Sequence, residues 1–145
     1  MLRVLTFGWE FAPLLSGGLG VACAGLGRAL ARLGVRLTFV VPRLPEAVEE
    51  RNLRVLSARA FAPRRETRSV DTLLAPYRTA EEYLRLRSEA GAAPAADGAL
   101  YGRDLFAEVE RYAEAASRIA AEVPHDVIHC HDWMTYEAGI RARSI

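Results

Sequence analysis

The chain has 145 residues, of which 51% are hydrophobic and 26% charged, and its formal net charge is +1. This length and apolar content suffice for one buried core without a disulfide or a structural metal, and they exclude an intrinsically disordered protein. The near-neutral charge argues against nucleic acid or an anionic membrane surface as a partner. No apolar run reaches the roughly 18 residues of a membrane span. Cys23 and Cys130 are expected to be free thiols, as in a cytoplasmic protein.

The first third of the sequence predicts a βαβ unit. Residues 2–7 and 35–41 are β-favouring apolar runs, each too short for a helix. Between them, apolar residues recur at helical spacing from Leu19 onward, and Gly34 is placed to end that helix in a left-handed conformation. A strand, a helix and a strand joined this closely form a right-handed crossover between parallel strands.

The middle of the chain carries weaker signals. Residues 53–57 and 70–75 are expected to be strands. A capping-box spacing of Thr and Glu predicts a short helix that begins at about residue 79 and ends before Gly91. The Ala/Gly/Pro-rich segment 88–98 has no apolar period and is expected to be a mobile surface loop.

Further helices and a strand complete the α/β pattern. A helix is expected from residue 104 to 123, where apolar residues that include Tyr112 keep a helical period, and Pro124 ends it. Residues 126–131 are expected to form the next parallel strand, and residues 135–143 the start of another helix. Strands and helices that alternate in this way predict a single domain with a Rossmann-like parallel sheet and flanking helices.

The loop after the first strand is rich in glycine, at Gly17, Gly18 and Gly20. In open parallel sheets, ligands bind at the carboxyl ends of the strands, and this first loop commonly forms one wall of the site. Glycines lack a Cβ and let backbone N–H groups approach an anion, and the following helix adds the positive end of its dipole. The loop therefore favours a phosphate site, with a tight turn and close helix packing as the alternative.

A nicotinamide-dinucleotide site is another candidate for this loop. The Gly-x-Gly-x-x-Gly pattern is incomplete, because Cys23 stands where the third glycine belongs. The acid expected after the second strand is also missing, although Arg43 could hold a 2′-phosphate there. A P-loop is excluded because the chain contains no Lys.

A zinc hydrolase is a further alternative, because His129 and His131 share one face of their expected strand and Asp132 follows them. Apart from these two, the chain has one histidine, His125, and no acid–His pair completes a second set of ligands. A partly buried His129 bonded to the backbone is therefore the preferred interpretation, and no metal is expected.

Two separated motifs stand out, FGWEFAPLLSGGLGVACAGLGRALARLGVRLTFVVPR at residues 7–43 and DVIHCHDWMTYEAGI at residues 126–140. Together they resemble the N-terminal domain of GT-B glycosyltransferases of the bacterial glycogen synthase and starch synthase kind. The family's fold has two Rossmann-like domains that face each other across a cleft, and the second holds most of the nucleotide-sugar donor. The resemblance implies that residues 1–145 are the acceptor-side domain of such an enzyme, truncated so that the donor-binding C-terminal domain is absent.

The resemblance also implies roles for individual residues. Gly17 and Gly18 would approach the donor diphosphate, and Glu10 would lie in the cleft near the sugar or the acceptor. Asp132 would bond hydroxyls of the transferred glucose or of the acceptor and is the expected catalytic residue, with His131 beside it as a substrate-binding residue. The implied reaction is retaining transfer of glucose from ADP-glucose or UDP-glucose to an α-1,4-glucan, without a metal or other cofactor.

Two positions depart from the pattern of this family. Leu15 stands where these synthases usually carry Lys, two residues before the paired glycines, and Val21 stands where an acid commonly follows. A cation near the phosphate or the acceptor is therefore missing at position 15. Since the donor-binding domain is also expected to be absent, we expect no transferase activity from this chain alone.

Overall fold

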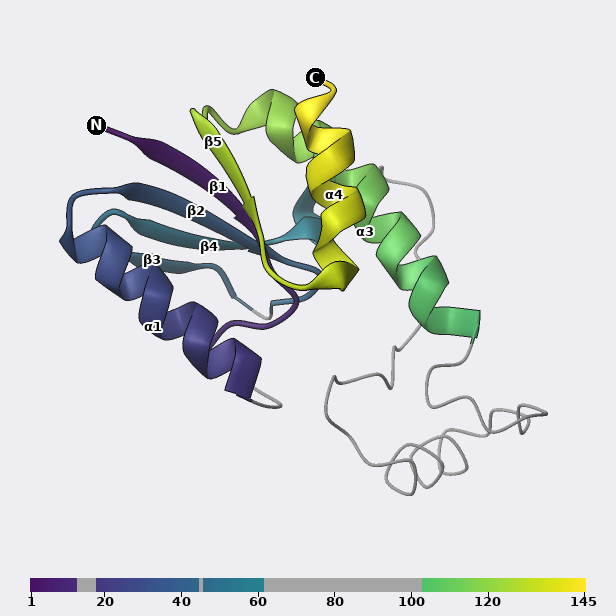
Figure 1. Cartoon of the computed structure of the whole chain (residues 1–145), viewed down its shortest axis with the longest axis horizontal. Helices are drawn as coiled ribbons and strands as arrows, with labels where there is room; N and C mark the ends of the chain where they lie inside the picture. Colours follow the sequence, from purple (N-terminus) through teal and green to yellow (C-terminus); the bar gives the residue numbers. More distant parts are fainter. Residues whose placement is uncertain (13–17, 45, 62–102) are drawn as a thin grey trace.

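The computed structural model describes residues 1–12, 18–44, 46–61 and 103–145 (Figure 1). The strand, short helix and loop expected between residues 70 and 98 lie outside these ranges, as do Leu15 and Gly17. The described residues form three layers, a central sheet with helices on both of its faces. Among them, no helix has both the length and the apolarity that crossing a lipid bilayer requires.

The sheet has five strands in the order β3-β4-β2-β1-β5. Neighbouring strands are parallel except for β3, which runs antiparallel to β4. The strands are β1 (Arg3–Phe7), β2 (Arg36–Val41), β3 (Val48–Glu50), β4 (Leu53–Ser57) and β5 (Val127–Cys130). β1 therefore lies between β2 and β5, and the carboxyl ends of these three strands meet at one edge of the sheet.

Helices cover the two faces of the sheet (Figure 1). They are α1 (Gly18–Arg32), the short 3₁₀-helix η1 (Ala58–Phe61), α3 (Arg103–Glu122) and α4 (Trp133–Arg143). α1 packs on one face, while α3 and α4 pack together on the other. Both faces are covered in this way because the strands are apolar on both sides, as is usual for parallel sheets.

Side chains that alternate along the strands divide the core into two clusters. On the α1 face, Phe11 and Phe39 are buried against Cys23. On the face of α3 and α4, Phe7 is buried with Tyr112. The sheet thus separates an α1 side from an α3/α4 side, a division that decides which residues share the site described below.

Most of the elements predicted within the described residues are confirmed. The parallel βαβ unit, β4, α3 and β5 lie within one or two residues of their predicted ends. Gly34 follows α1 with a backbone φ of +87°, the left-handed conformation expected of a helix-terminating glycine.

Two features differ from the prediction. Strand β3 carries no sequence signal, because it has three residues and two of them are Glu. It forms by pairing with β4 across a turn in which Asn52 has a φ of 61°. Helix α4 begins at Trp133 rather than at residue 135, because Asp132 caps its amino end.

Candidate functional site

The segments that follow β1 and β5 meet at the carboxyl edge of the sheet. Phe7, the last residue of β1, lies opposite Cys130, the last residue of β5. The His131 amide continues this ladder by donating to the Phe7 carbonyl at 3.0 Å. Glu10 and Asp132 follow these strand ends, so that two residues from opposite ends of the sequence leave the sheet at the same edge.

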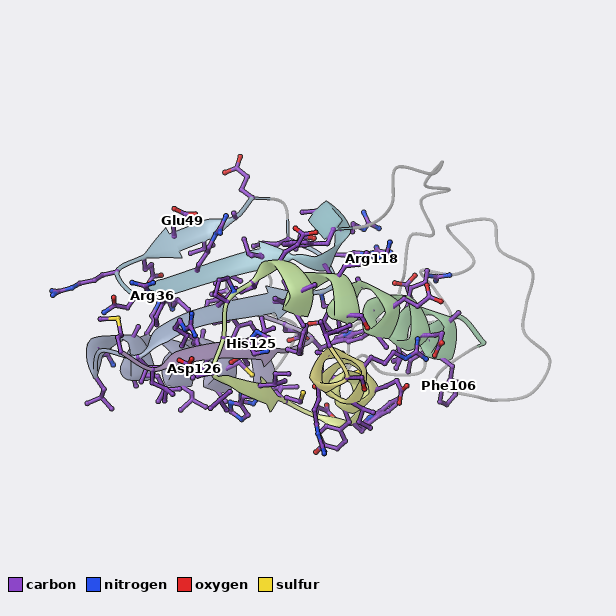
Figure 2. All side chains as sticks on the ribbon, turned by 90° about the horizontal axis from the view of Figure 1, so that it is seen from above. Arg36, Glu49, Phe106, Arg118, His125 and Asp126 are labelled. Carbon is purple, nitrogen blue, oxygen red and sulfur yellow. The ribbon has the colours of Figure 1, made fainter. Side chains whose placement is uncertain are left out.

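The same edge is reached by the amino ends of α3 and α4. Figure 2 shows Phe106, in the first turn of α3, and Asp126, just before β5, at opposite ends of the structure. The Phe106 ring lies 6.1 Å from the ring of Trp133, the first residue of α4. Phe106 and Trp133 therefore lie at the carboxyl edge of the sheet, and Asp126 lies at its amino edge.

The charges of two carboxylates at this edge act on a buried thiol. Cys23 of α1 is 2% exposed and Glu10 is 8% exposed. The pKa of the Cys23 thiol is raised to about 11, first by burial and then by the negative charges of Glu10 and Asp132. The structure thus brings the sequence-predicted pair Glu10 and Asp132 into one site, on the α1 side of the sheet.

Asp132 is held in an unusual backbone conformation at the junction of β5 and α4. Its φ is 74° and its ψ 156°, a region that residues other than glycine rarely occupy. Its Oδ1 accepts a hydrogen bond of 2.5 Å from the Trp133 amide. The Thr135 hydroxyl lies 2.9 Å from the Asp132 carbonyl and 2.8 Å from the His131 carbonyl. These bonds fix the direction in which the carboxylate leaves the sheet.

His131 lies beside Asp132 on the α1 side. Its ring stacks near that of Phe39, with centroids 5.9 Å apart, and lies 4.3 Å from the ring of His129. The pKa of His131 is lowered by burial and by repulsion from His129. A neutral imidazole is therefore favoured, which can both donate and accept a hydrogen bond.

The alternative of a zinc triad at His129, His131 and Asp132 gains no support from this arrangement. Within the described ranges, no three or more His, Cys, Asp and Glu side chains are grouped so that they could hold a metal ion. His129 lies in β5 and His131 directly follows this strand, so the two side chains point to the same face. Their tilted ring contact follows from this spacing alone.

Gly18 is the first residue of α1 and lies at the amino end of a 15-residue helix. A Cβ added there would meet no protein atom within 4 Å, so packing does not require glycine at this position. The first turn of α1 contains no acidic residue to offset the positive end of the helix dipole. This helix end is chemically suited to an anion, although Gly17, its predicted companion, lies outside the described residues.

Two residues near the site carry features that sequence reasoning does not find. Cys23 is predicted as a free thiol, but the effect of the Glu10 and Asp132 charges on it follows only from the tertiary structure. Tyr112 of α3 is predicted as one member of an apolar stripe, yet its hydroxyl contacts the carbonyls of Gly8 and Val40 at the strand ends. The helical period of α3 marks Tyr112 as buried, and no local signal indicates what its hydroxyl reaches.

The fold is shared with a protein of known structure. The chain aligns with sucrose-phosphate synthase from Thermosynechococcus elongatus at a TM-score of 0.60 and 16% sequence identity. The match covers 99% of this chain and 30% of that chain, so the present sequence spans about a third of that protein's length. Fold and match together define the class, a Rossmann-like α/β domain. No curated protein matches the chain in sequence.

The family model for the starch synthase catalytic domain matches residues 3–144, nearly the whole chain. The chain belongs to this family. The resemblance predicted from the two motifs is therefore confirmed, and the glycosyltransferase interpretation is favoured over nicotinamide binding and zinc hydrolysis.

Proposed function

We propose that this chain is the acceptor-side domain of an enzyme that transfers glucose, with retention, from ADP-glucose or UDP-glucose to the end of an α-1,4-glucan. The observation that carries the proposal is that Glu10 and Asp132 follow the ends of the paired strands β1 and β5 at the carboxyl edge of the sheet, where both charges act on Cys23. Parallel sheets bind their ligands at this edge. Membership of the starch synthase family supports a sugar nucleotide and a glucan as those ligands.

In the proposed reaction, the barrier comes from expelling a nucleoside diphosphate while positive charge grows on the sugar ring. Backbone N–H groups at the amino end of α1, together with its dipole, would stabilise the leaving group. Each well-aimed donor of this kind contributes about 3 kcal/mol to transition-state stabilisation. Asp132 would accept hydrogen bonds from hydroxyls of the glucose or the acceptor, and Glu10 and His131 would line the same cleft.

The proposed enzyme has a second Rossmann-like domain that holds most of the donor. This agrees with the share of the sucrose-phosphate synthase chain that the match covers, 30%. No metal or other cofactor is proposed, because the amide groups and the helix dipole supply the charge stabilisation. Cys23 and Cys130 are both free thiols, which fits the cytoplasmic location that we propose.

The test is a calorimetric titration of the chain with maltoheptaose, a short α-1,4-glucan. Glu10→Gln and Asp132→Asn keep shape but remove charge, and each is expected to weaken binding about tenfold or more, as loss of a charge-assisted hydrogen bond does. Glu122→Gln is the matched control, because Glu122 is exposed and lies by the amino ends of the strands.

Unchanged affinity in Glu10→Gln and Asp132→Asn would contradict the proposed site. Loss of binding on addition of a chelator would instead indicate a metal-dependent site. Equal losses in all three variants would mean that the glucan responds to overall charge rather than to these two carboxylates.

A further inference from the structure

The side chain of Tyr112, in α3, contacts the carboxyl ends of β1 and β2 from the face of the sheet opposite α1. Its side chain is 3% exposed, and its ring meets the rings of Phe7 and Trp9 edge-on, with centroids 5.9 Å apart in both cases. The hydroxyl lies 2.7 Å from the Val40 carbonyl and 3.1 Å from the Gly8 carbonyl. One side chain thus contacts three successive residues, Phe7, Gly8 and Trp9, just before Glu10.

The hydroxyl completes the hydrogen bonding where the two strands end. The Gly8 amide donates to the Val40 carbonyl at 2.9 Å, so this oxygen accepts from both Gly8 and Tyr112. The Tyr112 hydroxyl has one proton to donate. The shorter distance indicates that the Val40 carbonyl is its main acceptor and the Gly8 carbonyl its second one. Beyond Gly8 the backbone leaves the sheet towards Glu10, so the Tyr112 hydroxyl contacts this backbone two residues before Glu10.

The hydroxyl remains a donor under ordinary conditions. Burial raises the pKa of Tyr112 well above its usual value, which keeps the proton on the oxygen. Among the described residues, α3 contacts the strand ends through Tyr112, from the face opposite α1.

We propose that Tyr112 is a positioning residue whose hydroxyl, by fixing the Gly8 and Val40 carbonyls, sets the place at which Glu10 enters the ligand site. The inference rests on the proposed function for the role of Glu10, but the ordering of the backbone from Gly8 to Ala12 is a property of the protein alone. Tyr112 lies on the far side of the sheet from the site and acts only through this backbone.

The test compares Tyr112→Phe with a matched control in the same helix. Tyr112→Phe removes the hydroxyl and keeps the ring, while Ile119→Val removes one methylene group from a fully buried residue about two turns further along α3. Urea unfolding establishes how far each variant is destabilised overall. Amide hydrogen exchange of residues 9–12 and titration with maltoheptaose are then measured for both variants.

Tyr112→Phe is expected to accelerate exchange of these amides at least about fivefold and to weaken maltoheptaose binding about three- to tenfold, beyond any change in Ile119→Val. Equal exchange and equal affinity in the two variants would overturn the proposal, because Tyr112 would then only contribute to the core. If the wild-type chain does not bind the glucan, the proposed function fails. The hydrogen-exchange comparison then tests the positioning role without the glucan. Faster exchange of residues 9–12 in Tyr112→Phe but not in Ile119→Val supports that role.

Discussion

At the scale of the residue, Asp132 shows two effects of opposite sign on stability. Its backbone conformation, with φ 74° and ψ 156°, costs a residue other than glycine about 1–3 kcal/mol. Its carboxylate caps α4 through the Trp133 amide, and a cap of this kind stabilises a helix by about 1 kcal/mol. The fold alone therefore gives little reason to keep Asp at this position, and a ligand contact would supply one.

Substitutions of Asp132 separate these effects. Asp132→Ala keeps the strained backbone and loses the cap, so its free energy of unfolding is expected to fall by about 1 kcal/mol. Asp132→Gly relieves the strain and costs only a few tenths of a kcal/mol as a cap, so it is expected to be about 1–2 kcal/mol more stable than Asp132→Ala. Urea unfolding measures both variants, and a glycine variant less stable than the alanine variant would show that the backbone is not strained.

At the scale of the element, α4 approaches β5 closely at Gly139. A Cβ added at Gly139 would lie 2.3 Å from Cys130 Sγ, closer than such atoms come in proteins. In α1, by contrast, Gly25 is exposed and a Cβ there would meet nothing within 4 Å. Both glycines lie inside helices, but only the one in α4 is required by packing.

Alanine at these two positions is expected to have opposite effects. Gly25→Ala should raise the free energy of unfolding by about 0.5–1 kcal/mol, because alanine favours the helix and nothing obstructs it. Gly139→Ala should lower it by about 1–3 kcal/mol, because the sulfur or the helix must move. Thermal or urea unfolding tests both values.

The double variant Cys130→Ala/Gly139→Ala identifies the cause of the destabilisation. Removing the sulfur is expected to restore much of the stability lost in Gly139→Ala, since the two positions are in contact and their effects do not add. Strictly additive losses would mean that Gly139 matters for some reason other than its contact with Cys130.

The elements themselves were largely predictable. Long apolar periods, as in α3, and the glycine that ends α1 are local signals, and local signals predict helices well. Strand β3 was not predictable, because its few polar residues form a strand only when β4 is beside them. The start of α4 was placed too late, because the capping role of Asp132 depends on where β5 ends.

At the scale of the whole molecule, the described chain has one Rossmann-like sheet, and the proposed reaction needs two such domains. We therefore expect no release of nucleoside diphosphate when the purified chain is mixed with maltoheptaose and either ADP-glucose or UDP-glucose. The physical reason is that catalysis requires donor and acceptor to be held together in one geometry, and the proposed function assigns most of the donor contacts to a second domain. Sustained turnover of either donor by the chain would contradict this expectation.

The sequence by itself determined the βαβ unit, β4, α3 and β5, the family, and the two motifs that carry the resemblance, because these depend on residue type and spacing along the chain. Only the tertiary structure decided that the charges of Glu10 and Asp132 act on the same thiol, and that a hydroxyl of α3 contacts the backbone carbonyls where two strands end. Such contacts join residues far apart in the sequence, and their distances are fixed by how the helices pack across the sheet. No local sequence pattern indicates how the helices pack on the sheet.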